Sequence, residues 1–351
     1  MNKTFLCINF GCRVNAAETN QFAQKLISDG YTPLLSSKEG TGVDLVFINT
    51  CSVTAKANIE SLGKIRSLRH QFPDAQIIVS GCADFENIKE LPNIFLVKNI
   101  EKEEILKKIN GVYTPKIGDK FSHTHRYILK VQSGCTHNCS YCVVPQKRPY
   151  LWSLPIEEAV KTINLAVKNG YQEVIITGVN LDQYKYGFST LIESILKNTS
   201  IPLISFGSIP LNCIDDKFFL LLSTFDFRLS DFLHIPLQSG SDKILNLMNR
   251  PYTKEKIIET FNKLKKISPR PVKGGVGGGF AFGTDIIVGF PGETDADFQK
   301  TYNLCKQIGF KKIHVFRFSH RPGTLITDYY NSCSKLTKQV IKSRSEQLRK
   351  L

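Results

Sequence analysis

Cys135, Cys139 and Cys142 form a C-x3-C-x2-C pattern within eight residues. Three thiolates at this spacing can hold one side of a compact metal site, and the softness of sulfur restricts the metal to zinc, copper or an iron–sulfur cluster. A structural zinc or an ordinary four-iron cluster takes four protein ligands, whereas only three are local here. A three-cysteine 4Fe–4S cluster would leave one iron free for a small molecule. The alternative is a zinc knuckle whose fourth ligand is His137 or a residue elsewhere.

A second, dispersed set consists of Cys12, Cys51 and Cys82, with 38 and then 30 residues between them. Spacing alone says little, but each cysteine directly follows a predicted strand. These three thiolates could therefore hold a second cluster, and the alternative is three unrelated, partly buried cysteines. The remaining four are expected in the core or without a role: Cys7, Cys213, Cys305 and Cys333.

The N-terminal part of the chain, which must position the dispersed cysteines, has the pattern of alternating strands and helices. Strands are predicted at Phe5–Phe10, Leu45–Asn49 and Ile77–Ser80, and helices at Ala16–Ser28, Thr54–His70 and Phe85–Leu91. This βαβ pattern predicts a parallel sheet. Ligands of open α/β sheets bind outside the carboxyl ends of the strands, which is where all three dispersed cysteines fall.

A second βα series begins after a polar, turn-rich stretch. Six strands are predicted, with helices such as Ile156–Lys168 and Asp295–Gln307 between them: Tyr127–Gln132, Glu173–Thr177, Leu203–Phe206, Phe232–Ile235, Thr284–Val288 and His314–Phe318. Six βα units make a large part of a (β/α) barrel, whose chemistry lies at the carboxyl strand ends. The predicted organisation is a domain over 1–110, a linker over 111–125, a barrel over 126–330 and a basic helical tail over 331–351. Five glycines within 274–279 are expected to form a loop.

The balance of charge favours a polyanionic partner. Lysine and arginine number 46 and aspartate and glutamate 31, which leaves a formal net charge of +15. Such an excess is typical of nucleic-acid binding, because each phosphate contact releases counterions. No apolar run reaches the length of a membrane span, and no secretory signal opens the chain. We therefore expect a cytoplasmic protein with no membrane contact, and metal binding in place of disulfides for its ten cysteines.

Taken together, these motifs resemble the methylthiotransferase family of radical S-adenosylmethionine (SAM) enzymes, over nearly the whole length. The cysteine triplet after a first barrel strand, with aromatic Tyr141 before its last cysteine, is similar to the superfamily motif. Further segments resemble family motifs: 10–19, 48–54, 80–82, 237–250, 284–294 and 321–324. Arg13-Val14-Asn15 and Val53-Thr54 look most like the branch that modifies N6-threonylcarbamoyladenosine at tRNA position 37.

The resemblance implies a fold, cofactors and partners. The fold is an α/β chain with an N-terminal parallel-sheet βαβ domain followed by a partial (β/α)6 radical SAM barrel. The cofactors are SAM and two 4Fe–4S clusters, one on each cysteine set, and the reaction moves a methylthio group to C2 of the base. The partners are a tRNA anticodon loop, an external electron donor and a sulfur source, and we expect a monomer. The small C-terminal β-barrel that the family normally carries is not visible in the sequence.

Other site residues follow from their places in this scheme. Thr177, Gly178 and Asn180 end the second barrel strand and could meet the amine or carboxylate of SAM, although a plain turn is the alternative. Gln238 and Ser239 could bind the SAM ribose or the substrate, with helix capping as the alternative for Ser239. Basic residues among aromatic ones would contact the RNA loop: Lys147, Arg148 and Arg250. We assign no catalytic acid or base.

Rival interpretations keep part of this scheme and change the rest. The same chemistry could act on isopentenyladenosine in tRNA or on an aspartate of a ribosomal protein. A non-enzymatic iron–sulfur electron carrier is disfavoured by the long βα series, since a cluster cage needs little more than the cluster loops. A zinc RNA-binding protein would share the cysteines and the charge but none of the radical chemistry.

Overall fold

The computed structural model describes residues 3–34, 42–99, 101–102, 126–267 and 280–351. The predicted linker at 111–125 and the glycine-rich stretch at 274–279 lie outside these residues. The described chain divides into two compact units. Unit 1 comprises residues 1–135, 144–179 and 198–201, and unit 2 comprises residues 136–143, 180–197 and 202–351.

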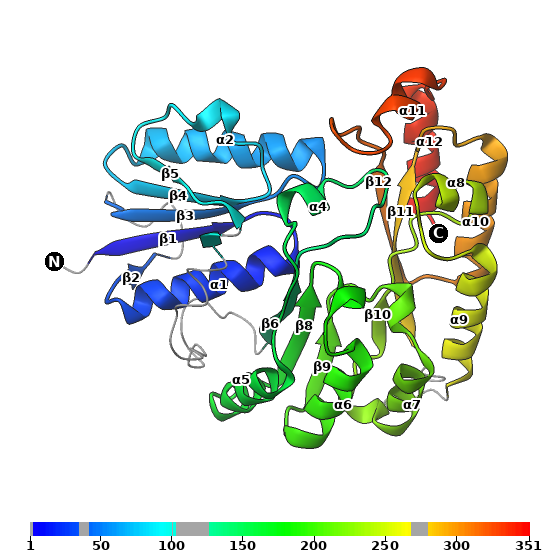
Figure 1. Cartoon of the computed structure of the whole chain (residues 1–351), viewed down its shortest axis with the longest axis horizontal. Coiled ribbons are helices and arrows are strands. Elements are labelled where there is room, and N and C mark those ends of the chain that lie inside the picture. The colour runs from blue at the N-terminus through cyan, green and yellow to red at the C-terminus, as the bar shows by residue number, and fades with distance from the viewer. Residues whose placement is uncertain (1–2, 35–41, 100, 103–125, 268–279) are drawn as a thin grey trace. The chain divides into compact units, whose positions relative to one another are not determined.

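Unit 1 contains the expected parallel sheet, with strand order β2-β1-β3-β4-β5 and all neighbouring pairs parallel. Helices α1 and α2 cover its two faces (Figure 1). The elements are β1 (Thr4–Asn9), α1 (Arg13–Ser28), β2 (Thr32–Pro33), β3 (Leu45–Thr50), α2 (Ala55–Gln71), β4 (Gln76–Gly81), the short 3-10 helix η1 (Glu86–Ile88) and β5 (Ile94–Leu96).

The sheet is the centre of a hydrophobic core. Every residue of β3 is buried, as expected for a central parallel strand covered on both faces. Ile48 and Val79 face α2 residues such as Leu62, Ile65 and Leu68 in one cluster. Phe47 faces the other way, stacked on Phe22 of α1 with ring centroids 4.0 Å apart. The two helices therefore pack on opposite faces of the strands whose ends carry the dispersed cysteines.

Unit 1 also holds the start of the second βα series. Strand β6 (Arg126–Ser133) pairs parallel with β8 (Glu173–Gly178) and antiparallel with the short β7 (Trp152–Ser153). Between them lie α4 (Val144–Lys147) and α5 (Ile156–Lys168). The pairing of β6 with β8 shifts register between Lys130 and Gln132, close to the end of β6 that leads into the cysteine loop.

Unit 2 contains the other four strands of the series. Strands β10 (Phe232–His234), β11 (Ala281–Val288) and β12 (Lys312–Arg317) form a parallel sheet in that order. The remaining elements are η2 (Leu181–Gln183), α6 (Phe188–Asn198), β9 (Leu203–Phe206), η3 (Leu211–Cys213), α7 (Asp216–Thr224), η4 (Asp226–Arg228), α8 (Asp242–Leu247), α9 (Lys254–Lys266), α10 (Asp295–Ile308), α11 (Thr327–Ser332) and α12 (Lys338–Arg349).

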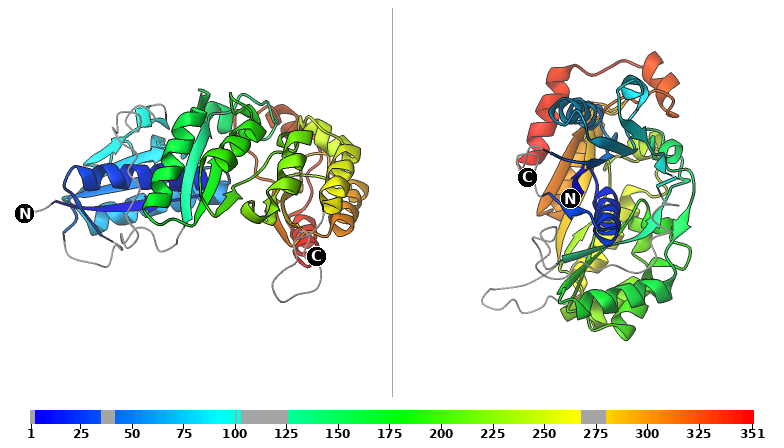
Figure 2. Two further views of the ribbon diagram at one scale, coloured as in Figure 1. Left: turned by 90° about the horizontal axis from the view of Figure 1, so that it is seen from below. Right: turned by 90° about the vertical axis from the view of Figure 1, so that its left-hand side faces the viewer.

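The basic tail forms a helix that belongs to this second core. Helix α12 lies alongside the strands β11 and β12, as the right-hand view of Figure 2 shows. Its Arg344 is buried and pairs with Glu293 Oε2 at 2.5 Å and with Asp295 Oδ1 at 2.6 Å.

All six predicted strands of the second βα series are present in the expected order. No helix in the described part of the chain is long and apolar enough to cross a membrane.

Candidate functional site

Cys12, Cys51 and Cys82 lie at the carboxyl ends of three neighbouring strands of unit 1. They follow β1, β3 and β4, which are in register and end at the same level of the sheet. The backbone N–H of Cys82 donates to Thr50 O at 3.1 Å. The side-chain amide of Asn99 donates to Cys82 Sγ at 3.7 Å. The predicted placement of the dispersed set at one sheet edge is therefore what the fold produces.

Two glycines let the turns after these strands approach one another. Gly11 has a φ of +87°, and a Cβ there would lie 2.6 Å from the Cβ of Cys51 and overlap its sulfur. Gly81 has a φ of +107°, and a Cβ there would lie 2.5 Å from Thr50 N. L-residues rarely adopt such positive φ values, and here no room exists for a side chain either. The Cys12 turn consequently packs directly on Cys51.

A buried cluster of charged side chains lies in the same unit and was not predicted. We call Glu18, Lys102, Lys130 and Arg148 the Glu18 cluster. Arg148 forms a two-pronged pair with Glu18, at 2.7 Å to Oε1 and 2.9 Å to Oε2. Lys102 Nζ lies 2.6 Å from Glu18 Oε2, and Lys130 Nζ lies 3.2 Å from Oε1. All four side chains are at most about one twentieth exposed, so three cations surround one carboxylate inside the protein.

The electrostatics of the Glu18 cluster extend to the cysteines. Burial raises the pKa of Glu18, but the three cations outweigh it and hold that pKa well below its usual range. Desolvation raises the pKa of the Cys12 thiol, and Arg148 opposes this shift. Cys82 and Cys12 are in turn among the groups that raise the pKa of Arg148. The pKa of the Cys12 thiol remains raised overall, and Arg148 reduces the rise that burial causes.

The C-x3-C-x2-C loop begins at the end of β6. Gly134 has a φ of +82°, and a Cβ there would lie 2.6 Å from the carbonyl carbon of Tyr150. The next residue, Cys135, donates its N–H to Arg148 O at 3.2 Å. Cys135 is the last residue of its segment in unit 1, and Cys139 and Cys142 belong to unit 2.

Within unit 2 the rest of this loop is held by the segment that follows α8. Ser140 donates its N–H to Met248 O at 3.1 Å and its hydroxyl to Leu247 O at 2.6 Å. Asn249, whose φ is +54°, donates to Asn138 O at 3.0 Å. A non-glycine residue at positive φ is a local strain that only strong surroundings maintain. The predicted Met248-Asn249-Arg250 motif thus has a structural function, which is to fix the cysteine loop.

Arg250 occupies a different place from the expected RNA contact. Its Nη1 lies 3.4 Å from Cys139 Sγ, and its Nε and Nη2 donate to the Tyr252 hydroxyl at 2.8 and 2.6 Å. Tyr252 is buried and donates onward to the carbonyl of Pro236 at 3.2 Å. The guanidinium therefore points at a cysteine sulfur and is anchored behind by a buried phenol.

Arg148 was also expected to contact the RNA loop. It is instead buried in the Glu18 cluster and donates hydrogen bonds to Asn15 and Ser133 as well. Lys147 is the partly exposed member of the basic set, three positions before Tyr150, which is 66% exposed. Of the aromatic neighbours, Trp152 is half-buried with Lys130 Nζ 5.1 Å from its ring centroid. The surface available to RNA in this segment is accordingly Lys147 with Tyr150.

The predicted SAM contacts are distributed over both units. Thr177 is buried and Gly178 pairs with Gln132, so both belong to the β8 ladder of unit 1. Asn180 lies in unit 2, with its Nδ2 3.3 Å from His137 Nδ1. The other ring nitrogen of His137 lies 3.4 Å from Asp182 Oδ2. Both nitrogens of the ring thus have partners, which disfavours His137 as the fourth ligand of a zinc knuckle.

Gln238 and Ser239 follow β10 in unit 2. Gln238 has a φ of +70°. Its backbone pairs with β11: its N–H donates to Asp285 O at 2.8 Å, and its carbonyl accepts from the N–H of Ile287 at 2.9 Å. Such strain in a non-glycine residue is characteristic of ligand sites. The Ser239 hydroxyl lies 3.2 Å from both Thr301 Oγ1 and Ser241 N, a structural arrangement.

The donors around both cysteine sets fit thiolate-bound iron–sulfur clusters. Sulfur atoms of Cys82 and Cys139 each face an N–H donor, and such bonds strengthen when the sulfur is an anionic ligand. Hydrogen bonds to the ligating sulfurs are a usual feature of iron–sulfur sites.

Comparisons with known proteins identify the families that the two parts of the sequence match. The model of the Radical SAM superfamily matches residues 129–305, and that of the uncharacterized protein family UPF0004 matches residues 4–100. A solved structure of the radical S-adenosylmethionine methyltransferase TsrM from Kitasatospora setae, with cobalamin and a 4Fe–4S cluster bound, is similar in fold. Its TM-score is 0.65 at 14% identity, over 90% of this chain and 75% of that chain.

Curated relatives match nearly the whole chain. The threonylcarbamoyladenosine tRNA methylthiotransferase of Chlamydia pneumoniae is 35% identical over 98% of this chain and 81% of that protein. The tRNA-2-methylthio-N(6)-dimethylallyladenosine synthase of Thermodesulfovibrio yellowstonii is 32% identical over 90% of this chain and 76% of that protein. This likeness, together with the two cysteine sets, shows that the chain belongs to the radical SAM tRNA methylthiotransferase family and is an enzyme of that kind.

Proposed function

We propose that this enzyme adds a methylthio group to C2 of N6-threonylcarbamoyladenosine at position 37 of tRNA. The observation that carries the proposal is the 35% identity, over 98% of the chain, to a relative named for that base. Relatives with the same name from Aquifex aeolicus, Thermotoga maritima and Bacillus subtilis are 32–33% identical. The motif residues Arg13-Val14-Asn15 and Val53-Thr54 resemble the same branch and also support the proposal.

The proposal includes two 4Fe–4S clusters and SAM. Cys135, Cys139 and Cys142 would hold the cluster that binds SAM, and Cys12, Cys51 and Cys82 would hold the second. A cluster held by Cys135, Cys139 and Cys142 would supply one-electron chemistry for the reductive cleavage of SAM, which is suited to an unactivated C–H bond. The protein supplies orientation and a water-free surrounding.

The residues of this chain have definite tasks in that scheme. Arg250 orients Cys139 and brings positive charge to its sulfur. Leu247, Met248 and Asn249 hold the loop between the cysteines through their bonds to it. In unit 1 Arg148 of the Glu18 cluster opposes the effect of burial on the Cys12 thiol, which must lose its proton to become a ligand. Gln238 and Asn180 are proposed to contact SAM, and Lys147 to contact RNA.

The decisive experiment compares two substrates in one assay. tRNA that carries the threonylcarbamoyl group and the same tRNA without it are incubated with the reconstituted enzyme, and the nucleosides are analysed by mass spectrometry. We expect the 2-methylthio product only from the modified tRNA, and no product from the Cys139→Ala variant. Equal methylthiolation of both tRNAs would contradict the assigned base.

A second candidate base is isopentenyladenosine. It is supported by relatives named dimethylallyladenosine synthases, which reach 32% identity over 90% of the chain. Product only on tRNA carrying this base would establish the second candidate, and product only on a ribosomal-protein aspartate would exclude both. The cluster count is tested by iron analysis, with about eight irons expected per chain. Changing Cys12, Cys51 and Cys82 to alanine together should halve that iron and leave SAM cleavage intact.

A further inference from the structure

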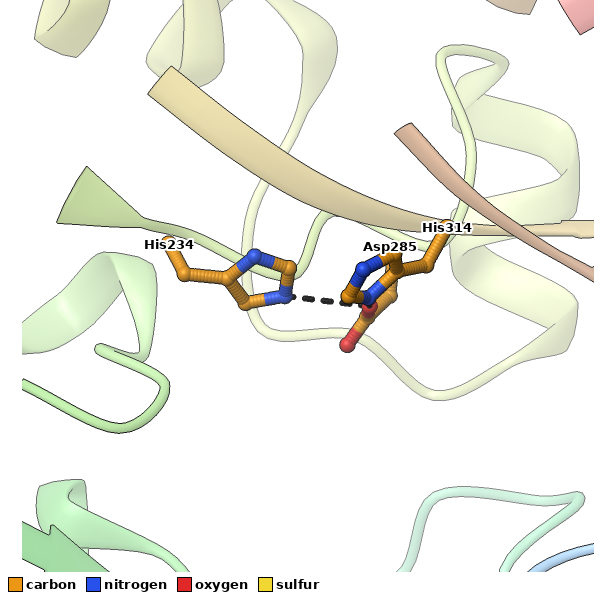
Figure 3. A group of neighbouring side chains, drawn as sticks. All are labelled: His234, Asp285 and His314. Carbon is orange, nitrogen blue, oxygen red and sulfur yellow. Dashed lines mark hydrogen bonds and ion pairs between the residues drawn. The ribbon is translucent and has the colours of Figure 1, made fainter. Parts of the chain in front are cut away.

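His234, Asp285 and His314 meet on three adjacent strands of unit 2 (Figure 3). They come from β10, β11 and β12, and the register places Asp285 directly beside His314 and His234 beside Gly283. His234 Nε2 lies 3.0 Å from Asp285 Oδ1, and His314 Nδ1 lies 3.3 Å from the same oxygen. The two imidazole rings reach this oxygen from two sides, with centroids 5.2 Å apart.

The group lies on the side of the sheet away from α9. Phe282 of β11 packs on Phe261 of α9, with ring centroids 5.0 Å apart. Side chains alternate along a strand, so Gly283 and Asp285 project to the opposite face. Glycine is required at position 283, because a Cβ there would lie 2.7 Å from His234 Nδ1. The absence of a side chain at 283 leaves the space that the His234 ring fills.

The arrangement of donors is that of a metal site. Both imidazoles converge on Oδ1, while Oδ2 has no hydrogen bond within the described residues. Two donor atoms 3.0–3.3 Å apart, each bound to one ion at about 2.1 Å, subtend about 90–105° at that ion, between octahedral and tetrahedral values. Asp285 and His314 are partly open to solvent, so an ion can enter.

We propose that His234, Asp285 and His314 bind one divalent metal ion such as zinc. Two imidazoles and one carboxylate suit zinc or ferrous iron, whereas magnesium and calcium prefer oxygen ligands throughout. Three protein ligands leave at least one position open for a small oxygen or nitrogen donor. The group shares no residue with either cysteine set, so its failure would leave the proposed function untouched.

The test measures zinc binding with the metal alone. The anaerobically prepared enzyme with its iron–sulfur content is titrated with Zn²⁺ by calorimetry at pH 7.5, and zinc and iron per chain are counted after desalting. We expect one zinc per chain beyond any bound by thiols, with iron unchanged. His314→Gln removes an exposed ligand and should weaken this site at least about tenfold. His320→Gln, a histidine of the same unit stacked on Tyr330, is the matched control and should bind as the unchanged chain does.

The pH dependence gives a second readout. Protons compete with zinc for imidazole nitrogens, so zinc affinity should fall as the pH is lowered from 7.5 to 5.5. Asp285→Asn should also weaken binding, and circular dichroism checks that the variant folds. No zinc beyond the thiol-bound background, or equal binding by the His314→Gln and His320→Gln variants, would overturn the proposal.

Discussion

Arg250 shows how one side chain can act on a cofactor ligand. Its guanidinium lies 3.4 Å from Cys139 Sγ, and the buried Tyr252 hydroxyl holds it there with two bonds. Burial lowers the pKa of Arg250, but Tyr252, Tyr141 and Cys139 reverse this effect and raise the pKa overall, so the charge is permanent. Hydrogen bonds and charge near cluster sulfurs are among the factors that set the reduction potential.

We predict that Arg250→Gln makes the potential of the cluster on Cys139 more negative. The cation stabilises the reduced form, which carries the additional negative charge, more than the oxidised form. A tenfold preference corresponds to about 60 mV for one electron. Potentiometric titration followed by electron paramagnetic resonance measures the shift, and iron content should be unchanged. Arg66→Gln, an exposed arginine on α2, is the control, and equal potentials in both variants would contradict the prediction.

Glu18 is the other residue on which a local network depends. Replacing its carboxylate leaves Lys102, Lys130 and Arg148 buried without their counterion. Breaking a buried pair by removing one partner typically costs about 3–5 kcal/mol. Glu18→Gln should therefore lower the free energy of unfolding by about that amount in urea titrations at pH 7. Glu60→Gln removes an exposed partner of Lys56 and should stay within about 1 kcal/mol.

The same residue predicts a pH dependence of stability. The pKa of Glu18 is lower in the folded chain than in the unfolded one, so its contribution is complete above the unfolded value of about 4.3. That contribution is lost as the pH falls from there through the folded pKa, because over this range the unfolded state binds a proton at Glu18 and the folded state does not. Below about pH 4.3 the unchanged chain should lose stability more steeply than Glu18→Gln, and parallel curves would argue against the assignment.

At the scale of elements, the turn between β1 and α1 gives a matched pair of variants. Gly11 and Gly30 share a φ of +87°, but only Gly11 would direct a Cβ into Cys51, while Gly30 has nothing within 4 Å. Alanine at either position costs about 1–2 kcal/mol for the left-handed backbone. Gly11→Ala should in addition lose the iron of the N-terminal cluster, as iron analysis would show. Full iron in Gly11→Ala, or the same loss in Gly30→Ala, would contradict the close packing of this turn.

The elements were largely predictable because their signals are local. Strands read from apolar runs between turn residues agree with β1, β3, β4 and all six strands of the second series to within a few residues. The stretch Phe85–Leu91, predicted as a helix, forms only the short η1. The short edge strands β2, β5 and β7, of two or three residues, carry no periodicity that could reveal them.

The side-chain networks were not predictable because they join distant segments. Glu18 meets Arg148 across 130 positions of the chain, and only the packing of α1 on β6 brings them together. The one local signal is Lys130, a charged residue that interrupts the apolar run from Tyr127 to Val131 within β6. His234 and His314 likewise meet only through the order of β10, β11 and β12. The cysteines were found because their chemistry is specific and their places after strands follow from topology alone.

For the whole molecule, the formal charge of +15 points to RNA, but the structure narrows which cations can reach it. Arg148 is buried and Arg250 is directed at Cys139, so neither is free to bind phosphate. Lys147 remains, in the same short segment as Tyr150 and Leu151, which are 66% and 50% exposed. A segment that carries a cation and exposed apolar and aromatic side chains suits an unpaired loop, whose bases stack while its phosphates pair with lysine.

Lys147→Glu should therefore weaken tRNA binding without affecting SAM cleavage in the absence of tRNA. Each lost contact to single-stranded phosphate lowers the slope of log affinity against log salt by about 0.7. Anisotropy titrations of labelled tRNA at several salt concentrations measure affinity and slope together. Lys56→Glu, an exposed lysine on α2, makes the same charge change elsewhere and is the matched control. Loss of affinity by Lys147→Glu alone, with the lower slope, would support a phosphate contact at Lys147. Equal loss of affinity in both variants would show that binding follows net charge and would contradict that contact.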